Sequence, residues 1–192
     1  MKTKTEKYEL TKTDVNNSWE KAKMIWKSLS IPYVISVRNR EQIEQLGEIG
    51  QALIGQLAFM KYPEFQIYTN LEKISEVFLD NPQRGLDAVI EHEQGHKFCP
   101  YDSVTLIILN HLVKKSLSET KLKDDENAIN AILNLYSDMC INTARVKQRS
   151  VDIPWAYQKL SIDRNDSFWK VYGKSMEFAW DKKILPEETK LD

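Results

Sequence analysis

Two of the three histidines in this chain are four residues apart, a spacing that suits a shared metal ion. Residues 92–96 read H-E-Q-G-H, which fits the pattern H-E-x-x-H. Residues four apart on a helix lie on one face, so both imidazole rings can reach one cation. Zinc binds neutral imidazole nitrogens, and a catalytic site commonly supplies three protein ligands and one position for water. The motif therefore predicts that His92 and His96 are zinc ligands.

Glu93 lies between these histidines in sequence and projects from an adjoining side of the predicted helix. A carboxylate there can accept the proton of a water molecule that the metal activates. Because zinc lowers the pKa of such a water toward about 7, a carboxylate is an adequate base near neutral pH. We therefore predict that Glu93 is a catalytic general base.

A catalytic zinc site needs a third protein ligand, and several residues are candidates. His111, 15 residues beyond His96, lies on an apolar segment, where a packed or rim histidine is more typical than a ligand. Glu119 and Glu126 fall in a charged connector and are expected to be solvated. Asp138 is a further candidate, which stands out for the polar residues around it.

Asp138 shares a helix-period segment with other polar residues. Asn134, Asp138 and Asn142 lie at i, i+4 and i+8, and Arg145 lies almost directly below Asp138. Such neighbours could orient a carboxylate ligand. The apolar residues of the segment face the other side, so Asp138 could equally be an ordinary solvent-facing residue. Periodicity alone leaves both alternatives open.

The segment around Asp138 resembles a family signature. Residues 134–142 read N-L-Y-S-D-M-C-I-N and resemble the N-x-x-[AS]-D-x-x-I-N signature of the metallopeptidase domain often found fused to a von Willebrand A-like module. In that family, a helix with this aspartate follows the H-E-x-x-H helix. Residues 68–70 also resemble the family's segment between strand and active-site helix, so the similarity covers residues 65–145. It implies that His92, His96 and Asp138 bind zinc, that Glu93 is the base, and that the fold is similar to small zincins such as the minigluzincins.

The group that would stabilise a tetrahedral oxyanion is less well defined, because the spacing selects none of the candidates. These candidates are Arg145, Tyr136, Tyr101 and Tyr157. Cys99, three residues after His96, is expected to be a buried, inert cysteine rather than a thiolate ligand.

The hydrophobic periodicity predicts mainly helices around these motifs. Helices are expected at 19–29 with Ser18 as N-cap, 40–60, 71–79, 86–97, 103–117, 127–147 and 167–180, and strands at 33–37 and 65–68. We therefore predict a mostly helical, zincin-like α+β fold with a small sheet beside the H-E-x-x-H helix. The chain is expected to form one domain, residues 1–192, with a flexible arm at 1–16 and a charged tail at 182–192.

Composition excludes several classes of protein. The 192 residues include 27 basic and 28 acidic side chains, a balance that argues against nucleic-acid binding. The polar N-terminus does not resemble a signal peptide, and the longest apolar run, residues 104–109, is too short for a membrane span. Two cysteines fit a reducing compartment, so a cytoplasmic location is expected.

Together these patterns predict a zinc-dependent metallopeptidase whose partner is a peptide or protein substrate. An extended substrate is expected to add to an edge strand, for which residues 65–68 are the candidate. Two alternatives remain: a non-catalytic zinc-binding regulatory or interaction domain, and a metal-dependent amidohydrolase acting on a small molecule. The sequence does not define the oligomeric state.

Overall fold

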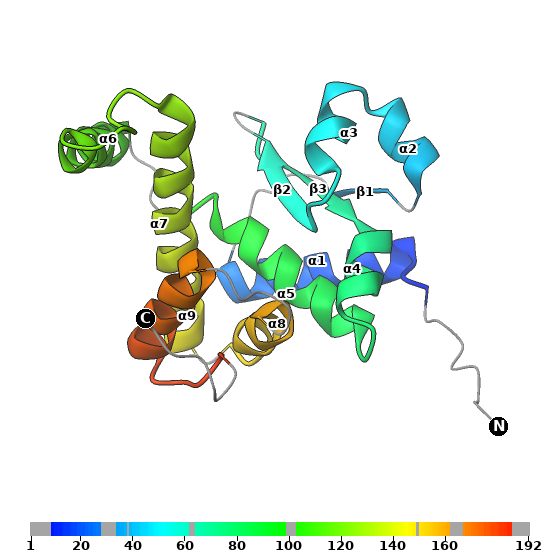
Figure 1. The fold of residues 1–192 in the computed structure, drawn as a ribbon. Coiled ribbons are helices and arrows are strands. Elements are labelled where there is room, and N and C mark those ends of the chain that lie inside the picture. Colours follow the sequence, from blue (N-terminus) through cyan, green and yellow to red (C-terminus); the bar gives the residue numbers. More distant parts are fainter. Residues whose placement is uncertain are drawn as a thin grey trace.

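A computed structural model describes residues 9–27, 34–37, 39–61, 64–98, 103–148, 150–161 and 167–185. This part of the chain forms nine helices and a three-stranded sheet, which confirms the prediction of a mostly helical α+β fold (Figure 1). Cys99 and Tyr101 lie outside the described residues. None of the helices in the described ranges is long and apolar enough to cross a membrane.

The helices and strands differ from the sequence predictions mainly in the N-terminal half. In chain order they are α1 (Lys12–Trp26), β1 (Val34–Val37), α2 (Arg40–Gln45), α3 (Glu48–Leu53), β2 (Ala58–Lys61), β3 (Gln66–Asn70), α4 (Leu71–Val77), α5 (Pro82–Gly95), α6 (Ser103–Leu117), α7 (Glu126–Lys147), α8 (Asp152–Ser161) and α9 (Ser167–Trp180).

The sheet has the order β1-β3-β2. β1 pairs with β3 in parallel, with Val34 opposite Ile67, and β2 pairs with β3 antiparallel, with Ala58 opposite Thr69. The strand predicted at residues 65–68 is therefore the central one, and its prediction as the substrate's edge strand is wrong. Both of its edges are already hydrogen-bonded to neighbours, so the edges of the sheet belong to β1 and β2.

Helix α1 begins earlier than predicted. Thr11 and Asp14 form a capping box, in which each side chain accepts a hydrogen bond from the other's backbone N–H. Leu10 and Val15 are each 3% exposed and belong to the core, so the prediction of a flexible arm at 1–16 is wrong for these residues. Ser18 is buried within the helix, where it donates to Asp87 and does not act as the N-cap.

The single helix predicted at residues 40–60 is also wrong, because glycines break it. Gly47 has φ 58° and Gly55 has φ 80°, a region that residues with a side chain rarely adopt. The first glycine separates α2 from α3, and the second lies between α3 and β2. The apolar residues after Gly55 therefore enter the sheet.

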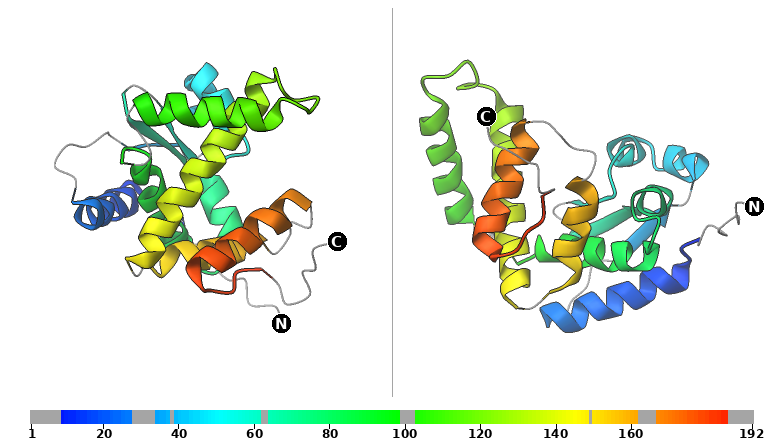
Figure 2. Two further views of the ribbon diagram at one scale, coloured as in Figure 1. Left: turned by 90° about the vertical axis from the view of Figure 1, so that its left-hand side faces the viewer. Right: turned by 60° about the horizontal axis from the view of Figure 1, so that its bottom comes forward.

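Helix α5 is the central element of the fold. Asn81 caps it by accepting a hydrogen bond from the backbone N–H of Arg84 at 3.0 Å, and Pro82 occupies its first turn, so it begins four residues earlier than predicted. It packs against α1, α4, α8 and β2, and α1 runs along one side of it (Figure 2).

The buried apolar residues form three clusters. The first joins α1, α4, α5 and α8, the second joins α7, α8, α9 and the segment after α9, and the third packs α2 and α3 on the sheet. Helix α8, which the sequence analysis missed, contributes Ala156 to the first cluster and Ile153 to the second. The candidate site lies where α5 and α7 approach each other.

Candidate metal centre

Three predicted ligands converge in the structure. Helix α5 supplies His92, its C-cap position supplies His96, and α7 supplies Asp138. Asp138 Oδ1 lies 3.5 Å from His92 Nε2 and 3.4 Å from His96 Nε2. One ligand atom from each residue lies within 4.8 Å of the others, so the group could hold a metal ion. The two imidazole rings are nearly perpendicular, with an interplanar angle of 88°.

The chemistry of Asp138 indicates that this group fits a cation. Its Oδ1 atom is buried and accepts no hydrogen bond in the described part of the chain. A buried polar atom without a partner costs free energy, and a cation among the three ligand atoms would remove that cost. Two imidazole nitrogens and a carboxylate oxygen are a ligand set that zinc accepts, and iron(II) uses the same set.

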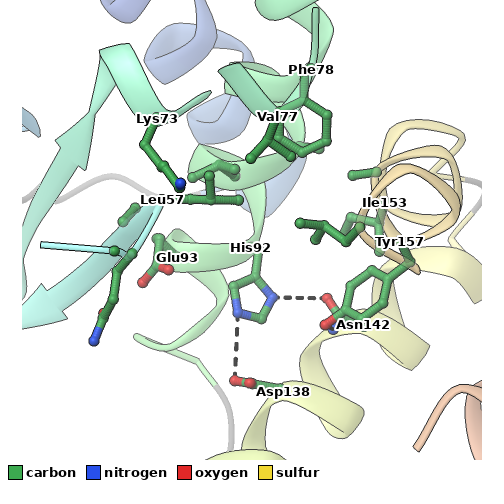
Figure 3. Close-up of a pocket in the computed structure, with 17 residues that line it drawn as sticks. Leu57, Lys73, Val77, Phe78, His92, Glu93, Asp138, Asn142, Ile153 and Tyr157 are labelled. Atoms are coloured by element: carbon green, nitrogen blue, oxygen red, sulfur yellow. Dashed lines mark hydrogen bonds and ion pairs between the residues drawn. The ribbon is translucent and has the colours of Figure 1, made fainter. Parts of the chain in front are cut away.

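Asn142 orients His92, as Figure 3 shows. Its Oδ1 lies 2.8 Å from His92 Nδ1, and its Nδ2 donates to Tyr157 Oη at 2.7 Å. Because the amide nitrogen donates to the tyrosine, the amide oxygen is the acceptor for the Nδ1–H of His92. In the neutral ring, the other nitrogen, Nε2, is then the unprotonated one, and it faces Asp138, where it is available to a cation. The helical spacing predicted instead that Asn142 orients the carboxylate of Asp138.

Two further residues of this network were not found from the sequence. Tyr172 of α9 lies 3.2 Å, oxygen to oxygen, from Tyr157, and Ser137 Oγ lies 3.4 Å from His96 Nδ1. Ser137 is next to Asp138 in the chain, so it was within reach of a sequence argument. The contact of Tyr172 depends on how α9 packs, which periodicity does not indicate.

Burial and charge separate the pKa values of the site residues. Burial alone would lower the pKa of His92, but the adjacent carboxylate of Asp138 raises it to about 9. Burial lowers the pKa of His96 to about 4 and raises that of Glu93 to about 7. These directions apply to the protein without a bound ion, in which one histidine carries the proton.

A cavity of about 370 Å³ opens beside the three ligands. His92, Glu93 and Asp138 line it on one side, and in Figure 3 Glu93 lies on the side of His92 nearer the sheet. The rest of its wall is mainly apolar: Leu57, Ala58, Val77, Phe78, Ala88, Val89, Ile153, Ala156 and Leu160. Lys73 and Tyr157 supply further polar groups. Tyr157 is thus an oxyanion candidate that the structure brings to the cavity.

Arg145 does not lie at this site, contrary to the position predicted for it below Asp138. It forms a buried ion pair with Glu91, in which Nε lies 2.7 Å from the carboxylate oxygen. Its guanidinium also hydrogen-bonds Gln148 and lies over the ring of Trp26. Arg145 therefore joins α7 to the face of α5 that points away from the cavity.

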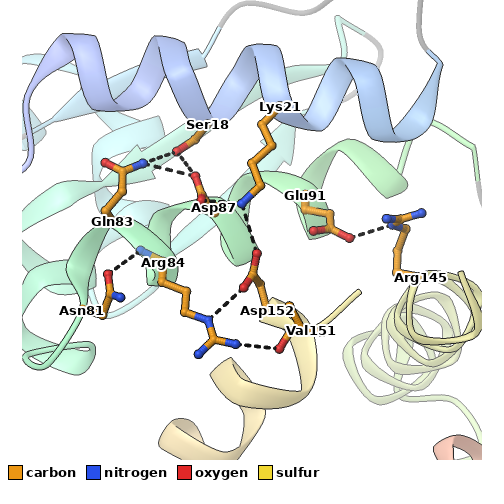
Figure 4. Close-up of polar contacts among 10 residues, drawn as sticks. All are labelled: Ser18, Lys21, Asn81, Gln83, Arg84, Asp87, Glu91, Arg145, Val151 and Asp152. Atoms are coloured by element: carbon orange, nitrogen blue, oxygen red, sulfur yellow. Dashed lines mark hydrogen bonds and ion pairs between the residues drawn. The ribbon is translucent and has the colours of Figure 1, made fainter. Parts of the chain in front are cut away.

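Two aspartates fix α5 against its other neighbours, as Figure 4 shows. Asp87 accepts hydrogen bonds from Ser18 and Lys21 of α1, and Asp152 accepts from Lys21 and Arg84. Asp152 begins α8, so these contacts link three helices. These contacts therefore attach α5, the helix that positions the two histidines, to both α1 and α8.

The remaining candidates lie elsewhere. His111 is exposed on α6, Glu119 and Glu126 are exposed in or beside the connector, and Tyr136 is 44% exposed on α7. No family model, curated protein or solved structure matches the chain. The family resemblance of residues 65–145 therefore stays a prediction.

Proposed function

We propose that this protein is a zinc-dependent peptidase that uses Glu93 as its general base. The observation that carries the proposal is the convergence of His92, His96 and Asp138 at the edge of a cavity that Glu93 also lines. The buried Oδ1 atom of Asp138, which accepts no hydrogen bond from the described residues, supports a cation at that point. The neighbouring carboxylate supports hydrolysis rather than a purely structural role.

A zinc ion held by these residues would polarise the scissile carbonyl and make a water molecule easier to deprotonate. Glu93 would accept that proton on its carboxylate and return it to the leaving amine. In the ion-free protein, burial raises the pKa of Glu93 to about 7, so this carboxyl group is not held permanently in its charged form. Asn142 would keep the Nε2 atom of His92 directed at the ion.

The edge of β2 that does not pair with β3 is the better position for an extended substrate. The Glu93 carboxylate accepts a hydrogen bond from the backbone N–H of Met60, so this edge of β2 faces the helix that carries the histidines. Ala58 of the same strand lines the cavity. A peptide that pairs with β2 would therefore pass the proposed zinc ligands.

The metal site is tested first by metal uptake. Purified protein is incubated with zinc, dialysed and analysed for metal, and its thermal unfolding is followed with and without the ion. We expect one zinc per chain and a higher Tm, because an ion that binds only the folded state stabilises it. His92→Ala and His96→Ala should lose both effects, and His111→Ala, which changes an exposed histidine, should keep them. Absence of uptake by the unaltered protein would overturn the site.

Hydrolysis is tested with Glu93→Gln on a library of quenched fluorescent peptides. We expect kcat/KM to fall by about 10²–10⁴-fold, the usual contribution of a general base, while zinc uptake is unchanged. Full activity in this variant would show that Glu93 is not the base. Zinc uptake without cleavage of any peptide would favour the non-catalytic zinc protein, and turnover of small amides alone would favour the amidohydrolase.

A further inference from the structure

Helix α6 and the start of α7 form a hairpin that is unusually apolar on its outside. Of the fourteen exposed large apolar residues in the described part of the chain, seven lie between residues 106 and 136. They are Leu106, Ile107, Ile108, Leu112, Leu122, Ile132 and Tyr136. Such a concentration is typical of an interaction surface rather than of scattered exposed side chains.

The position of α6 explains this exposure. It packs against α7 and lies at the outer edge of the molecule, away from the sheet and from α1 (Figures 1 and 2). None of its described side chains is buried. A helix that is apolar on several sides is normally covered on more than one of them, so the described part of the chain leaves α6 incompletely packed.

A groove runs between the two helices of the hairpin. Its volume is about 190 Å³, and its lining is almost entirely apolar. The lining residues are Leu109, Leu112, Val113, Ser116, Leu117, Ile132, Leu133 and Tyr136. We define these residues, together with the exposed Leu106, Ile108 and Leu122 of the same hairpin, as the hairpin patch. The groove has room for apolar side chains from another surface.

We infer that the hairpin patch is where a second copy of this chain docks. The six most exposed apolar members of the patch are 37–53% exposed, which leaves roughly 600 Å² of mainly apolar surface on each copy, the size of a large apolar patch. A twofold contact buries the same patch on both copies, so about 1,200 Å² in total would leave water, which reaches the lower limit for stable interfaces. The area therefore matches what a dimer of this chain needs.

The polar residues around the hairpin patch also favour a contact between identical surfaces. Lys114 and Lys115 lie near the end of α6, and Asp124 and Asp125 lie in the connector before α7. Lys114 already pairs with Glu126 within one chain at 2.8 Å. A rim that carries both signs of charge can face a rotated copy of itself with opposite charges opposed.

Sedimentation velocity of the full chain between about 1 and 100 µM tests the proposal. We expect the mass to rise with concentration from one chain of 22.5 kDa to a dimer. Leu112→Lys places a charge in the groove and should raise the dimer Kd by ~10-fold or more. Because Leu112 is 50% exposed, circular dichroism and Tm should show that this variant keeps the fold.

Ile107→Lys is the matched control. Ile107 is 69% exposed on the same helix, and the helical spacing turns it about 140° away from Leu112. We expect its dimer Kd to stay at the value of the unaltered chain. A chain that remains monomeric at the highest concentration would overturn the proposal, as would an association that both lysine variants weaken equally or both leave unchanged. The outcome is independent of zinc uptake and peptide cleavage.

Discussion

At the scale of single residues, the candidate metal centre depends on the amide of Asn142. This side chain is fully buried and contacts both His92 and Tyr157, so neither its position nor its orientation is free. A ligand whose ring is held in one orientation and one tautomer needs less rearrangement to bind an ion. Asn142 is not one of the three proposed ligands, but its replacement should still weaken metal binding, because it orients His92.

Asn142→Ala tests this role. We expect zinc to bind about 10–100-fold more weakly, because the Nδ1–H of His92 loses its acceptor. The number of zinc ions bound per chain at saturation should stay at one. The measurement is a competition titration against a chelating dye. Asn134→Ala is the matched control, since Asn134 lies two helical turns earlier on α7 and is exposed. Equal affinities in the two variants would contradict the assignment.

The sequence indicated the ligands better than it indicated what holds them. The spacing of His92 and His96 is a property of one helix, so it could be predicted locally. Asp138 was left undecided by periodicity and was selected only by a family resemblance. The partners of Asn142 and Arg145 depend on how α5 and α7 pack, and contacts between distant segments are not visible in the pattern of one helix.

At the scale of elements, the site requires that α5 and α7 approach each other closely. A Cβ atom on Gly95 would lie 2.4 Å from Cγ2 of Ile141 and 2.8 Å from the ring of Trp26, so only glycine fits there. One turn before Gly95, the buried Glu91 pairs with Arg145. These two contacts fix the separation between the histidines on α5 and the aspartate on α7.

Arg145→Met should destabilise the fold strongly. Glu91 is only 3% exposed, and removing its partner leaves a buried charge uncompensated, so we expect the free energy of unfolding to fall by about 3–5 kcal/mol. Urea unfolding measures the change. Lys147→Met removes an exposed cation from the same helix and should change the value by about 0.5 kcal/mol or less. Similar losses in both variants would argue against the buried pair as the cause.

Among the elements, long amphipathic helices were predicted well and short irregular segments were not. The predicted bounds of α6 and α9 agree with the structure, and those of α7 differ by one residue. Helix α8 was missed, and it carries Pro154 at its third residue, a type that interrupts most helical patterns. The order of the strands in the sheet could not be predicted from the sequence, because the pattern that predicts a strand does not identify the strands beside it.

At the scale of the whole molecule, the C-terminal segment completes the second apolar cluster. Ile184 and Leu185 are 3% and 5% exposed, and Glu177 accepts hydrogen bonds from both of their backbone N–H groups. Burial alone would raise the pKa of Glu177, but Lys174 and these N–H groups outweigh it and lower the pKa below 4.5. The carboxylate form is therefore the one that holds the segment in place.

The stability that Glu177 contributes should depend on pH. Because its pKa is lower in the folded protein, the contribution is complete above pH about 4.5 and is lost as the pH falls through the lowered value. We expect Glu177→Gln to reduce the free energy of unfolding by about 1–2 kcal/mol at pH 7, and the difference to shrink in acid. Glu119→Gln, in the exposed connector, should show no such dependence. A difference that is constant with pH would contradict this role.

The three proposed ligands come from helices that belong to two different apolar clusters. The two histidines belong to the helix of the first cluster, and Asp138 belongs to a helix of the second. An ion held by all three would join these two clusters as a removable cross-link, in addition to the buried pair between Glu91 and Arg145. Separation of α5 from α7 would then also require the ion to dissociate.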